Sequence, residues 1–165
     1  MSVNNKRRRV KVGDIYGIQL DGNSFGYCIV LEDGITGFFD LKTCELIQDV
    51  DIISCKNILF KVWIMKYSYK NGNWFSLGNI KLSEDMKKRV LFFKQDLFDY
   101  SQIYIYYEDR EKNEVIEIPA TYEDIRNLER AAVWDFEHIE DRLRDYFNGV
   151  PNISVEQLKP KLLKS

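Results

Sequence analysis

The residues best suited to chemistry are three cysteines and a single histidine. The cysteines are Cys28, Cys44 and Cys55, and the histidine is His138. A structural zinc site needs four such ligands, usually with pairs of them a few positions apart. No Cys-x-x-Cys pair occurs, and the cysteines are 16 and 11 residues apart. We therefore expect neither a metal centre nor a cofactor, and we interpret Cys28 as a small buried residue.

His138 stands among charged residues of a predicted helix. An imidazole gains or loses a proton near neutral pH, which suits acid–base catalysis or a binding contact. The neighbouring carboxylates Glu140 and Asp141 are adjacent, so they do not share a helix face and do not form a ready acid–base dyad. The sequence thus favours a surface imidazole beside carboxylates. It predicts no catalytic residues, and we expect the protein not to be an enzyme.

Glycines are frequent between Gly13 and Gly26, but they do not form a phosphate-binding loop. Neither Gly-x-Gly-x-x-Gly nor a P-loop pattern opens a helix there. Glycines within strands usually mark a bulge or a close backbone approach, as in the sharply bent strands of small barrels. Such barrels can bind nucleic acid through strand aromatics with basic residues between them. Candidates for that platform are Trp63, Tyr67, Tyr104, Tyr106 and Tyr107.

The net charge of −2 conceals two opposed regions. Five basic residues lie in the first eleven positions, and the remaining chain carries 19 basic and 26 acidic residues. All of this acidic excess is found between Glu108 and Asp145, which holds 13 acidic and 6 basic residues. A surface of that sign repels phosphate backbones and favours a basic partner. The basic leader, residues 1–10, is expected to be flexible and solvated.

The length and composition are those of a folded domain. With 165 residues, 45% of them hydrophobic and 14% aromatic, the chain can bury a core without disulfides. An odd number of cysteines indicates a reducing compartment. No apolar segment follows the basic leader as a signal peptide requires, and no apolar run is long enough to span a bilayer. We expect a cytoplasmic protein that does not associate with a membrane.

Residues 10–118 show the alternation of short strands. The pattern over 14–32, interrupted by the turn residues Asp21-Gly22-Asn23-Ser24, predicts a hairpin. Segment 58–67 is apolar on both faces, so we expect a central strand. Asn71-Gly72 predicts a hairpin between this strand and the strand at 74–80. Further strands are expected at 35–39, 90–94, 103–107 and 115–118.

After Pro119 apolar residues recur every three or four positions, which predicts an amphipathic helix. The prediction is clearest over 136–147, with Asp135 as the cap and Asn148-Gly149 as the stop. Thr121 and Asp124 form a variant of the capping box, and within the helix Glu140 and Arg144 form an i,i+4 pair.

Three segments stay open at this stage. Residues 122–134 fit either a continuous helix or a short turn followed by an extended segment. Segments 41–57 and 81–89 are unassigned, although the second has helical composition. The expected fold class is α+β: a mainly antiparallel, strongly bent β-sheet or small open barrel with a C-terminal amphipathic helix.

Two stretches resemble a known family. The first runs from Lys11-Val-Gly-Asp-Ile-Tyr-Gly to Gly26-Tyr-Cys-Ile-Val-Leu, and the second from Leu128-Glu-Arg-Ala-Ala-Val-Trp to Asp145-Tyr-Phe-Asn-Gly. Both are similar to the immunity protein 26 family, the cytoplasmic antitoxins of bacterial polymorphic toxin systems. Where relatives tend to have proline after the Trp-acidic pair, this chain has Phe136. The resemblance implies a single domain over 11–150, between the basic leader and a tail at 151–165.

The resemblance implies a non-catalytic protein that binds a cognate toxin domain and blocks it. The acidic segment agrees with a basic toxin, as nucleases often are. We expect the interface to include Trp134, Asp135, Glu137, Glu140 and Asp141, with Trp134 as an aromatic anchor. In the competing interpretation, Trp134, Arg142 and Leu143 only lock the helix onto the sheet.

The alternative class is a small-barrel module that binds nucleic acid or peptide through the basic leader and the strand aromatics. It would also lack catalytic activity. The acidic balance of the chain beyond residue 11 argues against a nucleic-acid partner.

Overall fold

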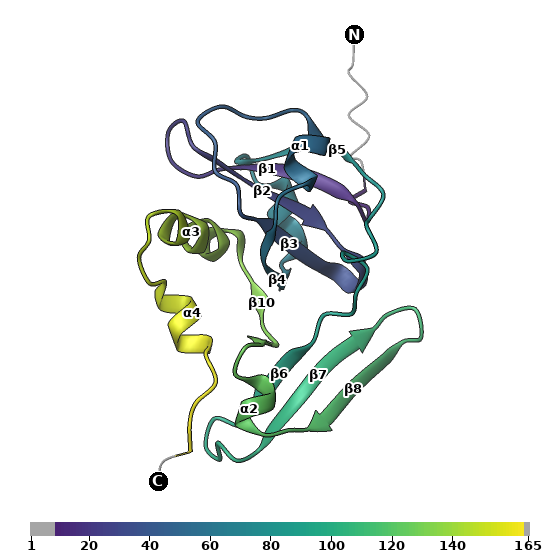
Figure 1. Cartoon of the computed structure of the whole chain (residues 1–165), viewed down its shortest axis with the longest axis vertical. Coiled ribbons are helices and arrows are strands. Elements are labelled where there is room, and N and C mark those ends of the chain that lie inside the picture. The colour runs from purple at the N-terminus through teal and green to yellow at the C-terminus, as the bar shows by residue number, and fades with distance from the viewer. Residues whose placement is uncertain (1–8, 164–165) are drawn as a thin grey trace.

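The computed structural model describes residues 9–163 and shows an α+β fold. In this part of the chain, ten strands form a six-stranded sheet of order β10-β4-β3-β2-β1-β5 and a four-stranded sheet of order β8-β7-β6-β9. Neither sheet closes into a barrel. Figure 1 shows the six-stranded sheet above the four-stranded sheet, with α3 and α4 at one side. Lys6, Arg7 and Arg8 of the basic leader lie outside the described residues, so its flexibility stays a prediction.

The elements follow the chain in this order. The strands are β1 (Asp14–Gln19), β2 (Phe25–Val30), β3 (Ile35–Phe39), β4 (Ile58–Ile64), β5 (Trp74–Asn79), β6 (Phe92–Gln95), β7 (Ile103–Asp109), β8 (Glu114–Pro119), β9 (Glu129–Arg130) and β10 (Val133–Trp134). The α-helices are α1 (Val50–Ser54), α2 (Tyr122–Ile125), α3 (Phe136–Phe147) and α4 (Ile153–Leu158). Two 3₁₀ turns, Glu32–Gly34 and Lys66–Lys70, lie next to β3 and β4.

The predicted N-terminal hairpin is confirmed. Strands β1 and β2 pair antiparallel, and the Ser24 amide donates to the Asp21 carbonyl at 2.7 Å within the turn. Gly13 precedes β1 with a φ of +90°, and a Cβ there would lie 2.1 Å from the Ile80 carbonyl oxygen. Glycine is therefore required where the chain enters β1 alongside the end of β5.

The predicted hairpin between 58–67 and 74–80 is wrong. Strand β4 lies between β3 and β10, whereas β5 pairs with β1 at the opposite edge of the sheet. The 3₁₀ turn after β4 redirects the chain, and the Trp74 ring meets Tyr69 edge to face at 5.9 Å. Burial of Trp74 in the core beside Ile18 thus decides the pairing, because an aromatic side chain gains more from burial than a two-residue turn supplies.

The second sheet contains the predicted strands near 90–94, 103–107 and 115–118. Strands β6, β7 and β8 form an antiparallel meander, but in a sheet of their own. Segment 81–89, which has helical composition, forms turns rather than a helix. There the Ser83 hydroxyl accepts from the Met86 amide at 3.2 Å. This bond fixes a local turn without the ladder of a helix.

The predicted helix over 136–147 is α3, and it begins and ends where the sequence predicts. The Asp135 side chain caps α3 by accepting from the Glu137 amide, and the chain leaves the helix through Gly149 at a φ of +70°. The capping box of Thr121 and Asp124 is also present. The predicted Glu140–Arg144 pair does not form an ion pair; Arg144 instead contacts Asp141 at 2.7 Å and Asp21 at 2.9 Å.

Residues 122–134 contain a short helix followed by extended chain. After α2, the two-residue strands β9 and β10 add parallel to β6 and β4. The segment from β9 to β10 therefore passes from the four-stranded sheet to the six-stranded sheet. It is the covalent link that places α3 against the upper sheet in Figure 1.

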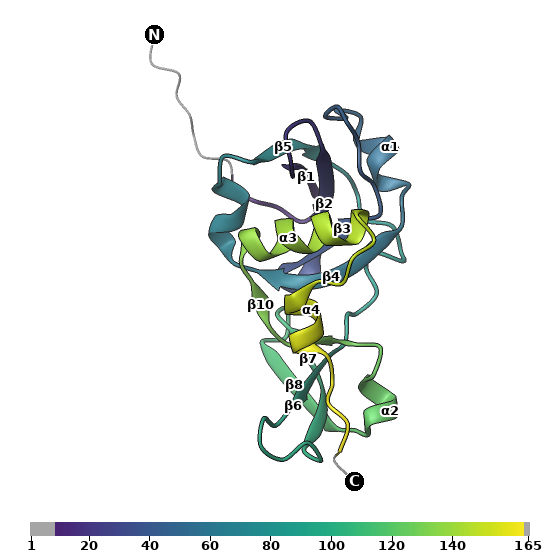
Figure 2. The same cartoon turned by 90° about the vertical axis from the view of Figure 1, so that its left-hand side faces the viewer.

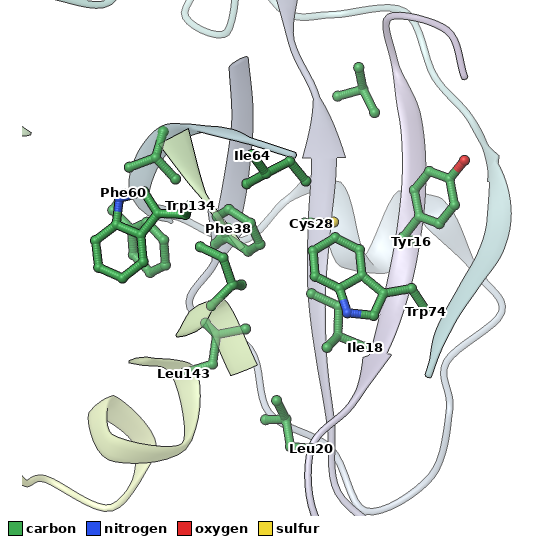
Figure 3. Close-up of a cluster of buried hydrophobic side chains, with 13 residues drawn as sticks. Tyr16, Ile18, Leu20, Cys28, Phe38, Phe60, Ile64, Trp74, Trp134 and Leu143 are labelled. Atoms are coloured by element: carbon green, nitrogen blue, oxygen red, sulfur yellow. The ribbon is translucent and has the colours of Figure 1, made fainter. Parts of the chain in front are cut away.

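The core continues from one sheet to the other. Figure 2 shows α3 across one face of the six-stranded sheet, where Ile139 and Leu143 join the buried cluster drawn in Figure 3. A second cluster includes Trp63 of β4 and Phe92 of β6, whose rings stack at a centroid distance of 4.0 Å. The two sheets thus share buried aromatic packing.

The three thiols should differ sharply in reactivity. Cys28 is fully buried, which raises the pKa of its thiol well above the usual range, whereas Cys44 and Cys55 are exposed. Because the thiolate is the reactive form, Ellman's reagent at neutral pH should modify Cys44 and Cys55 quickly and Cys28 only after denaturation. A Cys28→Ala variant, as the control, should lose only the thiol that becomes reactive on denaturation. Rapid modification of Cys28 in the folded protein would contradict this burial.

Candidate functional site

The five predicted interface residues lie together at the start of α3 but at different depths. Glu137 and Asp141 are exposed, and Asp135 is half-buried at the helix cap. Trp134 is only 4% exposed and Glu140 only 3%. In this conformation three of the five side chains can therefore reach a partner, while the other two lie beneath them.

Trp134 packs in the hydrophobic core under α3 (Figure 3). The Arg142 guanidinium lies 5.0 Å from the centroid of the Trp134 ring and 3.6 Å from that of Phe60. The same guanidinium binds the Glu129 carboxylate with two hydrogen bonds, the shorter at 2.5 Å. Trp134 and Arg142 thus fix α3 against the sheet in the way that the competing interpretation describes.

Asp135 joins α3 to the chain that follows β4. The Tyr67 hydroxyl donates to the Asp135 carboxylate, and this hydrogen bond lowers the pKa of Asp135 and raises that of Tyr67. The Tyr67 ring also meets Phe136 edge to face at 6.2 Å. The cap is thereby held in place by a partner far away in the sequence.

Exposed apolar side chains lie near the start of α3, and one of them, Tyr67, contacts Asp135. Met65, Tyr67 and Val133 are exposed, and β10 places Val133 beside β4, whose last residue directly precedes Met65. An apolar centre with a charged border is the usual anatomy of a protein–protein interface. We call this surface the α3 patch; it consists of Met65, Tyr67, Val133, Asp135, Glu137 and Asp141.

Glu140 is the buried carboxylate behind the α3 patch. Burial raises its pKa, although a hydrogen bond from Asn73 and the charge of Arg144 act in the opposite direction. A carboxyl group whose pKa is higher in the folded state favours folding in its protonated form. Its contribution is complete below the unfolded pKa of about 4.3 and is lost as the pH rises through the folded pKa.

The Glu140→Gln variant should therefore be more stable than the wild type at pH 7, because glutamine keeps an acceptor for Asn73 without a buried charge. The difference in free energy of unfolding should shrink as the pH falls towards about 4. Urea denaturation across this pH range measures it. Glu137→Gln, on the exposed face of the same helix, is the matched control and should show no such trend. If the difference in free energy of unfolding between Glu140→Gln and the wild type does not change with pH, the raised pKa of Glu140 is contradicted.

A pocket of about 540 Å³ lies where the two sheets meet, and sequence reasoning missed it. Its walls include Trp63 and Tyr106, two candidates for a base-stacking platform, but both rings are buried and meet edge to face at 5.9 Å. Lys94 and Arg110 contribute to the lining and are paired with Glu117 and Glu108. These paired cations leave a mainly apolar recess, which suits an apolar side chain better than a nucleotide phosphate.

Potential metal-ligating side chains do not cluster in the described part of the chain. Within residues 9–163, no group of three or more His, Cys, Asp and Glu side chains could hold a metal ion. His138 lies on the exposed face of α3, three positions after Asp135. None of the helices over the same residues has the length and apolar character needed to cross a membrane.

Comparison with known proteins identifies a family. The family model described as Immunity protein 26 matches residues 11–102, which is more than half of the chain. No curated protein and no solved structure matched the chain significantly. The matched segment contains the first of the two stretches that carry the resemblance and runs from β1 through β6, whereas β7, β8 and α3 lie beyond it.

An immunity protein acts on a toxin partner, so the match indicates an inhibitor rather than an enzyme. The candidate surface presents carboxylates and apolar side chains to a partner. The chain belongs to the immunity protein 26 family.

Proposed function

We propose that this chain binds one cognate bacterial toxin domain in the cytoplasm and neutralises it by non-covalent occlusion. The observation that carries the proposal is the family match over residues 11–102. The acidic segment from Glu108 to Asp145 supports a basic toxin such as a nuclease, because opposite charge steers the encounter and favours the correct partner.

The α3 patch is the proposed contact surface. Glu137 forms no ion pair with any residue in 9–163, and Asp141 has only the exposed pair with Arg144. Their carboxylates stand four positions apart on one face of the helix and can meet lysine or arginine side chains of a toxin. Met65, Tyr67 and Val133 supply exposed apolar area near the start of the helix.

Trp134 and Glu140 are buried, so in the proposed site they lie beneath the side chains that contact the toxin. Trp134 holds β10 and α3 together, and Glu140 binds Asn73 below the exposed turn that carries Glu137 and Asp141. Their role in this proposal is to position the contacting side chains. An anchoring contact from Trp134 itself would require α3 to move, because the ring is buried.

The test uses the toxin domain encoded beside the gene for this chain. Purified protein should inhibit that domain stoichiometrically, and binding should weaken as salt is added because surface charges are screened. Removing residues 1–9 should leave neutralisation intact, whereas a nucleic-acid-binding module would lose retention on nucleic acid. Full toxin activity in the presence of excess folded protein would overturn the proposal.

A further inference from the structure

Strand β8 presents an open edge at the end of the four-stranded sheet. It pairs with β7 alone, and nearly all of its residues are exposed (Figure 1). Its pairing runs without a register shift from Tyr104↔Pro119 to Asp109↔Glu114. A regular and exposed edge strand is a template on which another extended chain can pair.

One hydrogen bond shows which β8 residues direct their main-chain N–H and C=O groups towards β7 and which direct them outward. The Ala120 amide donates to the Ile103 carbonyl at 3.0 Å, and alternate residues of an antiparallel strand point to the same side. Ile118 and Ile116 therefore face β7, whereas the main chains of Val115 and Glu117 face outward. Pro119 also faces outward, where its missing amide costs no ladder bond.

The edge carries two charged residues, Glu114 and Glu117, but lacks most of the other features that protect such strands. No lysine or bulge interrupts it, and its one proline stands at the end. Val115 is 62% exposed and Ile118 is 46% exposed, and they lie on opposite faces of the sheet. An added strand would therefore bury apolar area on both sides while it pairs with two free amides.

The charges of the β7–β8 hairpin indicate which kind of chain can pair with this edge. The β7–β8 hairpin over 103–119 carries five acidic and two basic residues. Among residues 9–163, Glu111 and Glu114 form no ion pair, whereas Glu108, Asp109 and Glu117 are paired. A second copy would bring two such acidic hairpins together, and like charges side by side are unfavourable. A basic extended segment would meet complementary charge.

We propose that β8 binds an extended, basic segment of the toxin by adding it to the four-stranded sheet as a new edge strand. This inference rests on the proposed function and extends the toxin interface to a second surface. Affinity would come from the main-chain groups of Val115 and Glu117, and preference for lysine or arginine from the carboxylates of the hairpin.

Amide hydrogen exchange, read by NMR at single residues, tests the geometry directly. In the complex with the toxin domain encoded beside this gene, the amides of Val115 and Glu117 should exchange at least about tenfold more slowly than in the free protein. The amides of Ile116 and Ile118 should be protected already in the free protein, because they bond to β7. Unchanged exchange at Val115 and Glu117 in a saturated complex would overturn the inference.

A proline variant separates the backbone contact from the side chain. Val115→Pro removes an outward amide and leaves the bonds to β7, so it should weaken toxin binding about tenfold or more without unfolding the sheet. Val115→Ala removes the side chain, keeps the amide and should bind within about threefold of the wild type. Circular dichroism and thermal unfolding check that both variants remain folded.

The possible failures are distinguishable. If the wild type binds the toxin domain and folded Val115→Pro binds equally well, the edge-strand inference fails and the proposed function stands. If exchange at Val115 slows with protein concentration in the absence of toxin, a second copy occupies the edge and the inference is overturned. If the wild type does not bind the toxin domain, both proposals fall.

Discussion

Replacing Arg142 with alanine should lower the free energy of unfolding by about 3 kcal/mol. The Arg142 side chain is 10% exposed and its partner Glu129 is 29% exposed, so the variant leaves a poorly hydrated carboxylate without its counter-charge. It also removes the cation that lies against the rings of Phe60 and Trp134. The loss is large because one side chain satisfies both contacts.

The position of Arg142 in the topology adds to this effect. Its helix packs on the six-stranded sheet through Phe60 and Trp134, whereas Glu129 belongs to β9 in the four-stranded sheet. The guanidinium therefore ties α3 to both sheets. Lysine should not restore the wild-type stability, because an ammonium cannot make the two parallel bonds to Glu129 or stack flat on a ring.

Urea denaturation followed by circular dichroism measures the change. Arg126→Ala is the matched control: it deletes the same side chain from an exposed pair with Glu123 and should cost no more than about 1 kcal/mol. Equal midpoints for Arg142→Ala and the wild type would show that the buried pair contributes no net stability.

The parts of the fold that sequence reasoning predicted correctly depend on neighbouring residues. The β1–β2 hairpin follows from alternation around a four-residue turn, and α3 follows from an apolar stripe between the Asp135 cap and Gly149. Each signal is complete within about twenty residues. The residues that set where these two elements begin and end are therefore all local.

The parts that sequence reasoning missed depend on distant partners. Asn71-Gly72 has the composition of a tight hairpin, but the partner of β5 is decided by where Trp74 is buried. Strands β9 and β10 have two residues each and exist only because β6 and β4 offer an edge. No local pattern marks a strand so short.

The candidate site divides in the same way. Charge counting located the acidic helix, but it could not separate the exposed Glu137 from the buried Glu140, because Glu140 is covered by the folded chain and its partner Asn73 lies far away in the sequence. The mostly apolar segment Val115-Ile-Glu-Ile predicted a strand, yet whether that strand lies at an edge is a property of the sheet. Two carboxylates on the same helix can thus have different roles: one can contact a partner, while the other supports the fold from beneath the surface.

This distinction decides how charge reversal should be designed. Glu137→Lys combined with Asp141→Lys changes two exposed carboxylates of the α3 patch, while Glu140 is left intact because a lysine at its buried position would disrupt the fold. The double variant should bind the cognate toxin domain about 100-fold more weakly, mainly through slower association, since like charges would then face a basic partner. Surface plasmon resonance at low and high salt measures both rate constants.

The matched control is Glu84→Lys combined with Asp85→Lys. It changes the net charge by the same amount on the exposed segment between β5 and β6, away from α3 in Figure 1. If position matters, this pair should reduce the association rate only slightly, by about threefold, through the overall field. An equal loss in both double variants would assign the effect to net charge alone. An unchanged affinity in folded Glu137→Lys/Asp141→Lys would remove α3 from the interface, and β8 would then be the acidic surface left to meet the toxin.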